Sequence, residues 1–356
     1  MLRVFPEWSA LSRDQFDSEK PLPQPETGYF WLDITNPQVR RYLLDIMREM
    51  VTIYGVAGVN LDFMRFPQAL DWKKTYCFTK HAREAFEREY GMDPIGIHAM
   101  RQQDHWKTWT DWLEKMEDDF VIDLYKELKK ICSQVIVSAA PEPGAESEKI
   151  GNWSRHVDVV IPQAYYASSS EVRESVLLHK NELLPGNLIY SGIYPMYVRM
   201  GAQDTVDQVL AARDLDNGSV IFAFGQASEE AIHALRMGPW RNKAISTGLF
   251  PLRAIQALLE SARTDVEQVY ILRGAVSCTA AFKIENRLDA ALDCLQRYAG
   301  ADDGISVLET TMAEFTEWLG KGMKSGIIHS TAVLQLTKTL GEVRELLLYS
   351  RIKQVK

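Results

Sequence analysis

The sequence predicts an α/β fold in which parallel strands alternate with helices. Short apolar segments and helix-patterned segments take turns along the first two thirds of the chain, an order typical of parallel β/α units. The predicted strands are continuous apolar runs, as expected where both faces of a sheet are covered. Five strands are legible before residue 240, and this number fits either a doubly wound sheet or most of an eight-stranded barrel.

The first predicted unit is a helix followed by a strand. Asn36 and Pro37 open the helix as N-cap and first helical residue, and its apolar stripe stops at Gly55. VAGVNLDFM follows and is predicted to be a buried strand that ends before Arg65. Later helices are predicted at 79–90, 104–131, 170–184, 204–215 and 228–237, and later strands at 134–141, 157–166, 188–195 and 218–225.

A break at residues 240–250 separates this pattern from a mainly helical end. Helix-spaced apolar residues predict helices at 251–263, 285–298, 308–320 and 331–351. This segment has no catalytic spacing of polar residues. We therefore predict two domains, a β/α domain at 1–245 and a helical appendage at 246–356.

Composition excludes several classes of partner and site. The net charge of −8 argues against nucleic acid, because phosphate binding needs a basic surface. The four cysteines lack C-x-x-C spacing and the histidines are scattered, so we predict no metal site and no cofactor. Cys132 and Cys278 lie in apolar settings and are expected to be buried thiols. No apolar run reaches the roughly 18 residues of a membrane span.

Asp62 is the first candidate catalytic residue. It lies at the carboxyl end of the strand in GVNLDFMRFP, where barrel enzymes carry their chemistry. A lone carboxylate has no use inside a strand, because burying an unpaired charge is costly. A purely structural role, pairing with Arg65 or capping the next turn, explains the residue equally well from spacing alone.

The segment WLDITNPQVRRYLLDIMREMVTIYGVAGVNLDFMRFP resembles the glycoside-hydrolase-like family 10, a family once called a domain of unknown function. The corresponding family pattern is L-D-P-x-N-P-x-V-R, a helix, and Y-x-V-D-G-[IL]-H-[LF]-D-[DY]-x-R-[YF]-P. Further matches follow in order over about residues 5–245: FPEWSALSRD, YGMDP, VSAAP, a tryptophan followed by DVVIPQAYY, and GPWRNKA. The resemblance implies a (β/α)8 barrel of the TIM type that acts on or binds glycosidic linkages, with Asp62 as the matched carboxylate.

The chain departs from the family pattern around Asp62. Ala57 replaces the usual aspartate, Asn60 replaces the usual histidine, and Phe63 stands where some members carry a second aspartate. Losing the histidine alters the surroundings of Asp62 but leaves its carboxylate in place.

Glycoside hydrolysis usually requires a second carboxyl group, and Glu142 is the best candidate by position. It follows the strand VIVSAAP, on the same predicted edge as Asp62. A solvated loop glutamate is the competing interpretation. Glu146, Glu148 and Glu229 are weaker candidates, and Asp158, at the start of its strand, is predicted to be structural.

Substrate-binding residues are predicted from amide, phenol and indole groups at strand ends and in loops. Such groups bind sugar hydroxyls or stack on apolar sugar faces. Arg65 is expected to orient Asp62 or to bind substrate. The other candidates are Gln163, Tyr165 and Tyr194 at strand ends and Trp31 and Trp153 in loops.

These observations predict a glycosidase acting on a poly- or oligosaccharide. The alternatives are a non-catalytic carbohydrate-binding or cell-envelope protein on a degenerate barrel, and a lyase or aldolase barrel, which would need a strand-end lysine or metal ligands. Because the resembling family has strands ahead of FPEWSALSRD, we expect about three β/α units to be missing at the N-terminus or supplied by a partner chain. The resemblance favours an extracytoplasmic or cell-envelope setting.

Overall fold

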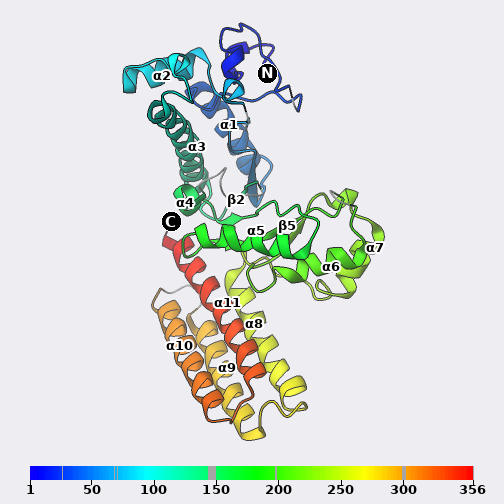
Figure 1. Cartoon of the computed structure of the whole chain (residues 1–356). Coiled ribbons are helices and arrows are strands. Elements are labelled where there is room, and N and C mark those ends of the chain that lie inside the picture. Colours follow the sequence, from blue (N-terminus) through cyan, green and yellow to red (C-terminus); the bar gives the residue numbers. More distant parts are fainter. Residues whose placement is uncertain are drawn as a thin grey trace. The chain divides into compact units, whose positions relative to one another are not determined.

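The computed structural model describes residues 1–25, 27–67, 69, 71–142, 150–196, 199–298 and 302–355. The chain forms two compact units, residues 1–162 and 163–356 (Figure 1). Both contain parallel strands and helices, so the predicted α/β class is confirmed. The closed barrel and the domain boundary at 245/246 stay predictions.

Three parallel strands organise the first unit. They are β1 (Gly58–Asp62), β2 (Ile136–Ala140) and β3 (Val159–Val160). β1 and β2 pair in register from Gly58 opposite Ile136 to Asp62 opposite Ala140, and Ser138 of β2 lies opposite Val159. The carboxyl ends of β1 and β2 therefore meet at one edge of the sheet.

The longer helices of this unit follow the sequence signals closely, whereas its single helical turn was not predicted. The helices are α1 (Pro37–Thr52), α2 (Lys80–Tyr90), α3 (Gln103–Ile131) and the single turn α4 (Ile150–Trp153). Asn36 caps α1 as predicted, because its Oδ1 accepts the N–H of Gln38 at 2.9 Å. α2 ends at Gly91, whose φ of 73° is a left-handed conformation that glycine adopts without steric cost.

Aromatic side chains from α2 and α3 form the centre of the first unit's core. Phe86, Trp109 and Trp112 are buried, with ring centroids of Phe86 and Trp109 5.0 Å apart and those of Trp109 and Trp112 5.3 Å apart. Rings at these separations add favourable contacts beyond their burial. This packing joins α2 to the long helix α3.

β1 alternates in exposure, and the prediction that it is buried on both faces is wrong. Val59 and Leu61 are buried, whereas Asn60 and Asp62 are exposed. Successive side chains of a strand point to opposite faces, so Asn60 and Asp62 share one open face. Asn60 Oδ1 accepts the hydroxyl hydrogen of Ser138 on β2 at 2.8 Å.

The second unit begins with a β/α part. It contains β4 (Leu188–Ile189), β5 (Ser191–Ile193) and β6 (Ser219–Ile221), with helices α5 (Ser169–Glu182), α6 (Ala202–Ala211) and α7 (Glu229–Met237). β5 and β6 pair in parallel, and Gln163 forms an isolated parallel bridge with Gly192. Two sequence predictions are corrected here. The strand predicted at 188–195 is interrupted at Tyr190, and that predicted at 157–166 is regular only at Val159–Val160.

Four helices form the C-terminal helical region. They are α8 (Pro251–Asp265), continued by a π-helical turn at Val266–Tyr270, α9 (Cys278–Tyr298), α10 (Asp302–Lys324) and α11 (Ser330–Val355). They lie side by side in Figure 1. The predicted helices were correct in number and order but too short, α9 beginning seven residues before the expected 285.

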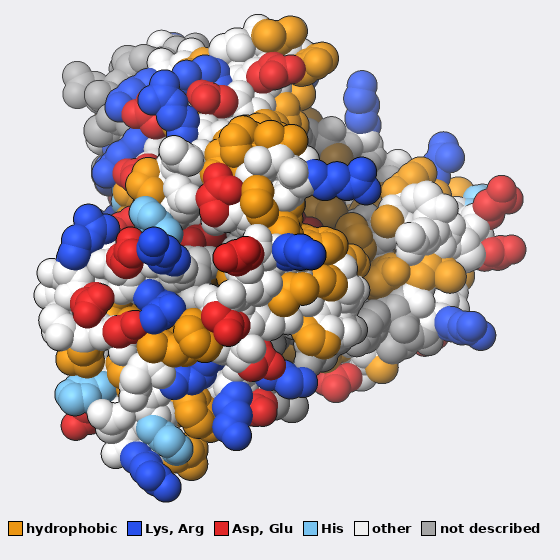
Figure 2. All heavy atoms as spheres, turned by 90° about the horizontal axis from the view of Figure 1, so that it is seen from above, with side chains coloured by type: hydrophobic (Ala, Val, Ile, Leu, Met, Phe, Trp, Pro, Cys, Tyr) orange, Lys and Arg blue, Asp and Glu red, His pale blue; other side chains and the backbone are white. Residues whose placement is uncertain are grey.

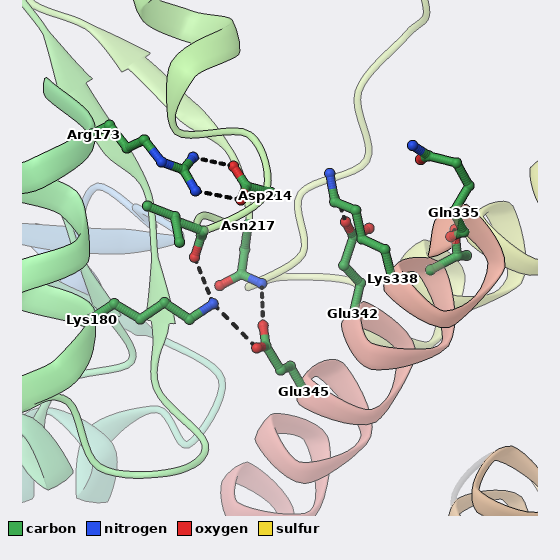
Figure 3. A network of polar contacts seen from close by, with 10 residues as sticks. Arg173, Lys180, Asp214, Asn217, Gln335, Lys338, Glu342 and Glu345 are labelled. Carbon is green, nitrogen blue, oxygen red and sulfur yellow. Dashed lines mark hydrogen bonds and ion pairs between the residues drawn. The ribbon is translucent and has the colours of Figure 1, made fainter. Parts of the chain in front are cut away.

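Polar side chains join α11 to the β/α part of the same unit (Figure 3). Lys180 Nζ lies 3.2 Å from a carboxylate oxygen of Glu345 and donates to the carbonyl of Leu215 at 2.6 Å. Asn217 donates its side-chain amide to the same carboxylate at 3.2 Å. Helix α5, through Lys180, and the connection before β6, through Asn217, thus contact one acidic residue of α11.

The cysteine prediction was wrong for both named residues. Cys132 and Cys278 are exposed, and Cys77 and Cys294 are buried. Cys132 follows the last residue of α3 and Cys278 is the first residue of α9. Apolar neighbours in the sequence pack into the core at these helix ends while the cysteines face outward. Every helix in the part of the chain that the structure describes is too short or too polar to span a membrane.

Candidate active site

Asp62 ends β1 on the open face of the first unit's sheet. It is exposed, and one of its carboxylate oxygens accepts the backbone N–H of Phe63 at 3.0 Å. Phe63 has φ of 55°, a left-handed conformation that is uncommon for a bulky residue and marks local strain. The chain therefore turns sharply directly after the carboxylate.

Arg65 is held by a carboxylate and two aromatic rings. Its guanidinium forms an ion pair with Glu142, and its side chain is only 8% exposed against 33% for Glu142. The carbon at the centre of the guanidinium lies 5.7 Å from the ring centroid of Trp31 and 5.6 Å from that of Phe63. Such cation–π contacts help to fix the cation.

The ion pair joins the ends of two neighbouring strands. Arg65 lies three residues after the end of β1 and Glu142 two residues after the end of β2. Glu142 is thus a half-buried ion-pair partner, and its catalytic role stays a prediction. Glu146 and Glu148 lie outside the described residues.

Two further aromatic residues belong to this strand end. Phe63 is 51% exposed, and Tyr29 is exposed as well. The Phe63 ring centroid lies 5.6 Å from that of Trp31 and 6.3 Å from that of Tyr29, both edge-on. Trp31 is itself oriented by a hydrogen bond from its Nε1–H to Gln24 at 3.3 Å. We did not predict Phe63 or Tyr29 as binding residues, although Phe63 follows Asp62 directly.

A third carboxylate approaches the same loop from α3. Glu117 accepts the backbone N–H of Phe66, which supports the turn that carries Arg65. We searched for catalytic residues at the carboxyl ends of predicted strands, and Glu117 lies in the middle of a predicted helix. Sequence reasoning therefore missed Glu117.

The loop placement predicted for Trp153 is wrong. Trp153 is the last residue of α4 and only 6% exposed, so its ring has little surface on which a sugar could stack. The loop with Pro141 and Glu142 was expected to continue to this residue, but the chain forms a helical turn from Ile150 onward.

Asp158 has the structural role that we predicted. It immediately precedes β3, and its carboxylate lies 2.8 Å from Lys129 Nζ, with both side chains buried. It also accepts the backbone N–H of Val137 at 2.8 Å. Asp158 lies at the amino end of the strands, whereas Asp62 lies at their carboxyl end.

A second aromatic group lies at strand ends of the second unit. The ring centroids of Tyr165 and Tyr194 are 5.3 Å apart, and Phe222 contacts both, at 5.8 and 5.3 Å. Tyr194 follows β5 and Phe222 follows β6. The Tyr194 hydroxyl donates to Gln226 at 2.9 Å. The two predicted tyrosines thus meet, and Phe222, which sequence reasoning missed, completes the group.

The surface of the protein carries side chains of both charges. On the face shown in Figure 2, Lys and Arg side chains are interspersed with Asp and Glu, and hydrophobic side chains gather between them. Within the described ranges, no group of three or more His, Cys, Asp or Glu is arranged to hold a metal ion.

The comparisons with known proteins identify the family. The family described as glycosyl hydrolase-like 10 matches residues 8–202, more than half of the chain. The chain belongs to this family. Membership gives it a glycosidase-like fold, and the matched range contains all the predicted site residues except the weaker candidate Glu229. Phe222 and Gln226 lie beyond the matched range.

Seven chains of known structure are similar to this protein. One is bee venom hyaluronidase, crystallised in complex with a hyaluronic acid tetramer, at 15% identity and a TM-score of 0.39, with 64% of this chain and 83% of that chain covered. A likeness at this level carries no argument about activity. No curated protein matches the chain.

Proposed function

We propose that this member of the glycosyl hydrolase-like 10 family is a glycoside hydrolase acting on a poly- or oligosaccharide through Asp62 and Glu142. The observation that carries the proposal is the ion pair between Arg65 and Glu142. It links the end of β2 to the turn directly after Asp62. Glycosidases usually need two carboxyl groups at one site, and the register of the strands, with Asp62 opposite Ala140, supports Glu142 as the second.

The exposed rings support a carbohydrate as substrate. Tyr29 and Phe63 are exposed beside half-buried Trp31, and sugars present apolar ring faces that stack on such side chains. The group at Tyr165, Tyr194 and Phe222 in the second unit has the same chemistry and is a separate candidate for sugar binding.

The environment of Glu142 constrains its role. The guanidinium of Arg65 stabilises the ionised carboxylate, whereas a general acid must carry a proton to the leaving oxygen. Acting as acid therefore requires Glu142 to separate from Arg65 when substrate binds. A role as base or nucleophile requires no such step, and Asp62 then becomes the acid.

Release of reducing ends from a panel of glycans tests the proposal. We expect Asp62→Asn and Glu142→Gln each to lower the rate by about 100- to 10,000-fold, the usual contribution of a catalytic carboxyl group. Asp45→Asn, which changes an exposed carboxylate on α1, is the matched control and should leave the rate unchanged. Wild-type rates in both site variants would contradict the proposal.

Aryl glycosides with a good leaving group can show which of Asp62 and Glu142 is the acid and which is the nucleophile. Loss of the acid slows such substrates little but slows unactivated glycans strongly, because only the latter need protonation of the leaving oxygen. Loss of the nucleophile slows both kinds of substrate. The variant that retains activity on the aryl glycoside identifies the acid.

A non-catalytic carbohydrate-binding protein is the second candidate. The exposed rings favour binding, and Asn60 lies on the same open strand face as Asp62 where the family pattern has histidine. Glycan binding by the wild-type protein without release of reducing ends would support this function and exclude hydrolysis of the glycans tested.

A further inference from the structure

The end of the helical region that is drawn at the bottom of Figure 1 combines exposed apolar side chains with basic charge. We define the bundle tip as residues 271–284, which join α8 to α9 and begin α9, and 321–334, which join α10 to α11 and begin α11. Leu272 is 78% and Phe282 64% exposed. The exposed apolar residues of the second segment are Met323, Ile327 and Leu334.

The two segments of the tip are fixed to each other. Val276 and Ile328 form an antiparallel bridge, and the N–H of His329 donates to the carbonyl of Ala275 at 2.9 Å. Gly274 and Gly326 have φ of 66° and 71°, the left-handed conformation that lets each connection turn tightly. The exposed apolar side chains are therefore carried by two segments that backbone hydrogen bonds hold together.

The charge of the tip is opposite to that of the chain. Its two segments contain Arg273, Lys283, Lys321 and Lys324 and no Asp or Glu, whereas the whole chain has a net charge of −8. Lys321 is paired with Glu317 at 2.7 Å, and the nearest acidic residues flanking the first segment are Glu267 and Glu285. Because Lys321 is paired with Glu317, the remaining positive charge of the tip is that of Arg273, Lys283 and Lys324.

We propose that the bundle tip docks on a membrane surface that contains anionic lipid. Exposed apolar side chains that gather at one place mark interaction sites, and those of a peripheral protein enter the boundary between headgroups and acyl chains. Lysine and arginine beside them are attracted to anionic headgroups. An anionic bilayer matches both features of the tip, its apolar side chains and its positive charge.

Sedimentation with vesicles tests this proposal. The full chain should sediment with phosphatidylcholine vesicles that contain phosphatidylglycerol, less with phosphatidylcholine alone, and less as salt is raised, because salt screens the attraction. Arg273→Glu/Lys324→Glu should weaken binding by about fivefold or more for each positive charge removed. Leu272→Ser/Ile327→Ser should weaken binding to both kinds of vesicle.

Val307→Ser and Lys243→Glu are the matched controls. Val307 is an exposed apolar residue near the opposite end of α10, and Lys243 is exposed and lies outside the tip. Both controls should bind vesicles like the wild type, and all variants should keep the wild-type circular dichroism.

Three results would overturn the proposal. They are a wild-type protein that stays in solution with anionic vesicles, tip variants that sediment as well as the wild type, and a doubling of mass in solution without vesicle binding. If the doubled mass were abolished by Leu272→Ser/Ile327→Ser, it would assign the tip to self-association. None of these results depends on Asp62, so failure here is separate from failure of the proposed hydrolysis.

Discussion

The position of Arg65 shows how one residue can link several parts of a site. Its guanidinium contacts the carboxylate of Glu142 and lies near the rings of Trp31 and Phe63. A lysine at this position would keep the charge but lose the planar group that contacts carboxylate and rings together. The guanidinium therefore positions three neighbours, in addition to any contact with substrate.

Asp216, which has no proposed catalytic role, has an altered pKa. Burial raises the pKa of Asp216 to about 7, although the Ser191 hydroxyl donates a hydrogen bond to this carboxyl. Desolvation disfavours the charged form. Lys180 and Lys338 act in the opposite direction but more weakly.

Asp216→Asn should make the protein more stable at high pH. The folded protein keeps the Asp216 proton up to about pH 7, whereas the unfolded chain releases it near the ordinary aspartate value. The contribution of this group to the free energy of unfolding thus falls as pH rises from about 4 to about 7 and is constant above. Asparagine does not titrate and can still accept from Ser191.

Urea unfolding at a series of pH values measures this effect. We expect the gain of the variant over the wild type to be small near pH 4 and to reach about 2–4 kcal/mol at pH 8. A difference that does not change with pH would show that Asp216 is ionised in the folded protein at neutral pH.

At the scale of elements, the two ends of the first unit's strands differ in what their carboxylates contact. At the carboxyl ends, Asp62 is exposed. At the amino end of β3, Asp158 is buried against Lys129 of α3 and accepts a hydrogen bond from the Tyr125 hydroxyl at 3.3 Å. Burial beside Asp158 also raises the pKa of the Tyr125 hydroxyl. The buried pair fixes α3 to the sheet.

Lys129→Met should destabilise the first unit strongly. It leaves the Asp158 carboxylate buried without its cation, a change that costs about 3–5 kcal/mol in buried pairs. Lys129→Met/Asp158→Asn removes both charges and should recover part of the loss. A fall in the midpoint of urea unfolding measures the cost, and a single variant as stable as the wild type would contradict a buried ion pair.

At the scale of the whole molecule, the tryptophans are distributed unevenly. Seven of the nine lie in the first unit, and the second contains Trp240 and Trp318. The second unit contains the four long C-terminal helices. Fluorescence therefore reports mainly on the first unit, and the helices of the second contribute strongly to circular dichroism.

Urea unfolding followed by both signals should give two midpoints. Compact units with their own cores can unfold separately, and each is stabilised by its own buried residues. Coincident fluorescence and circular dichroism curves would show instead that the two units unfold as one cooperative structure.

The sequence by itself determined the order and type of the longer helices and the strand end at Asp62. Local signals sufficed for these features: the Asn36 cap, the turn at Gly91, and apolar periodicity, which depend on neighbours along the chain. The family was also recognisable from ordered motifs. The predicted role of Asp158 was correct because its place at the start of a strand distinguished it from Asp62.

Only the tertiary structure decided which side chains meet. The pairing of Arg65 with Glu142, the support from Glu117 and the meeting of Tyr165 with Phe222 join residues far apart in the sequence. Burial was decided in the same way, since Trp153 and Asn60 differ from their predicted environments. Periodicity describes which face a residue occupies, whereas what covers that face depends on distant segments that fold against it.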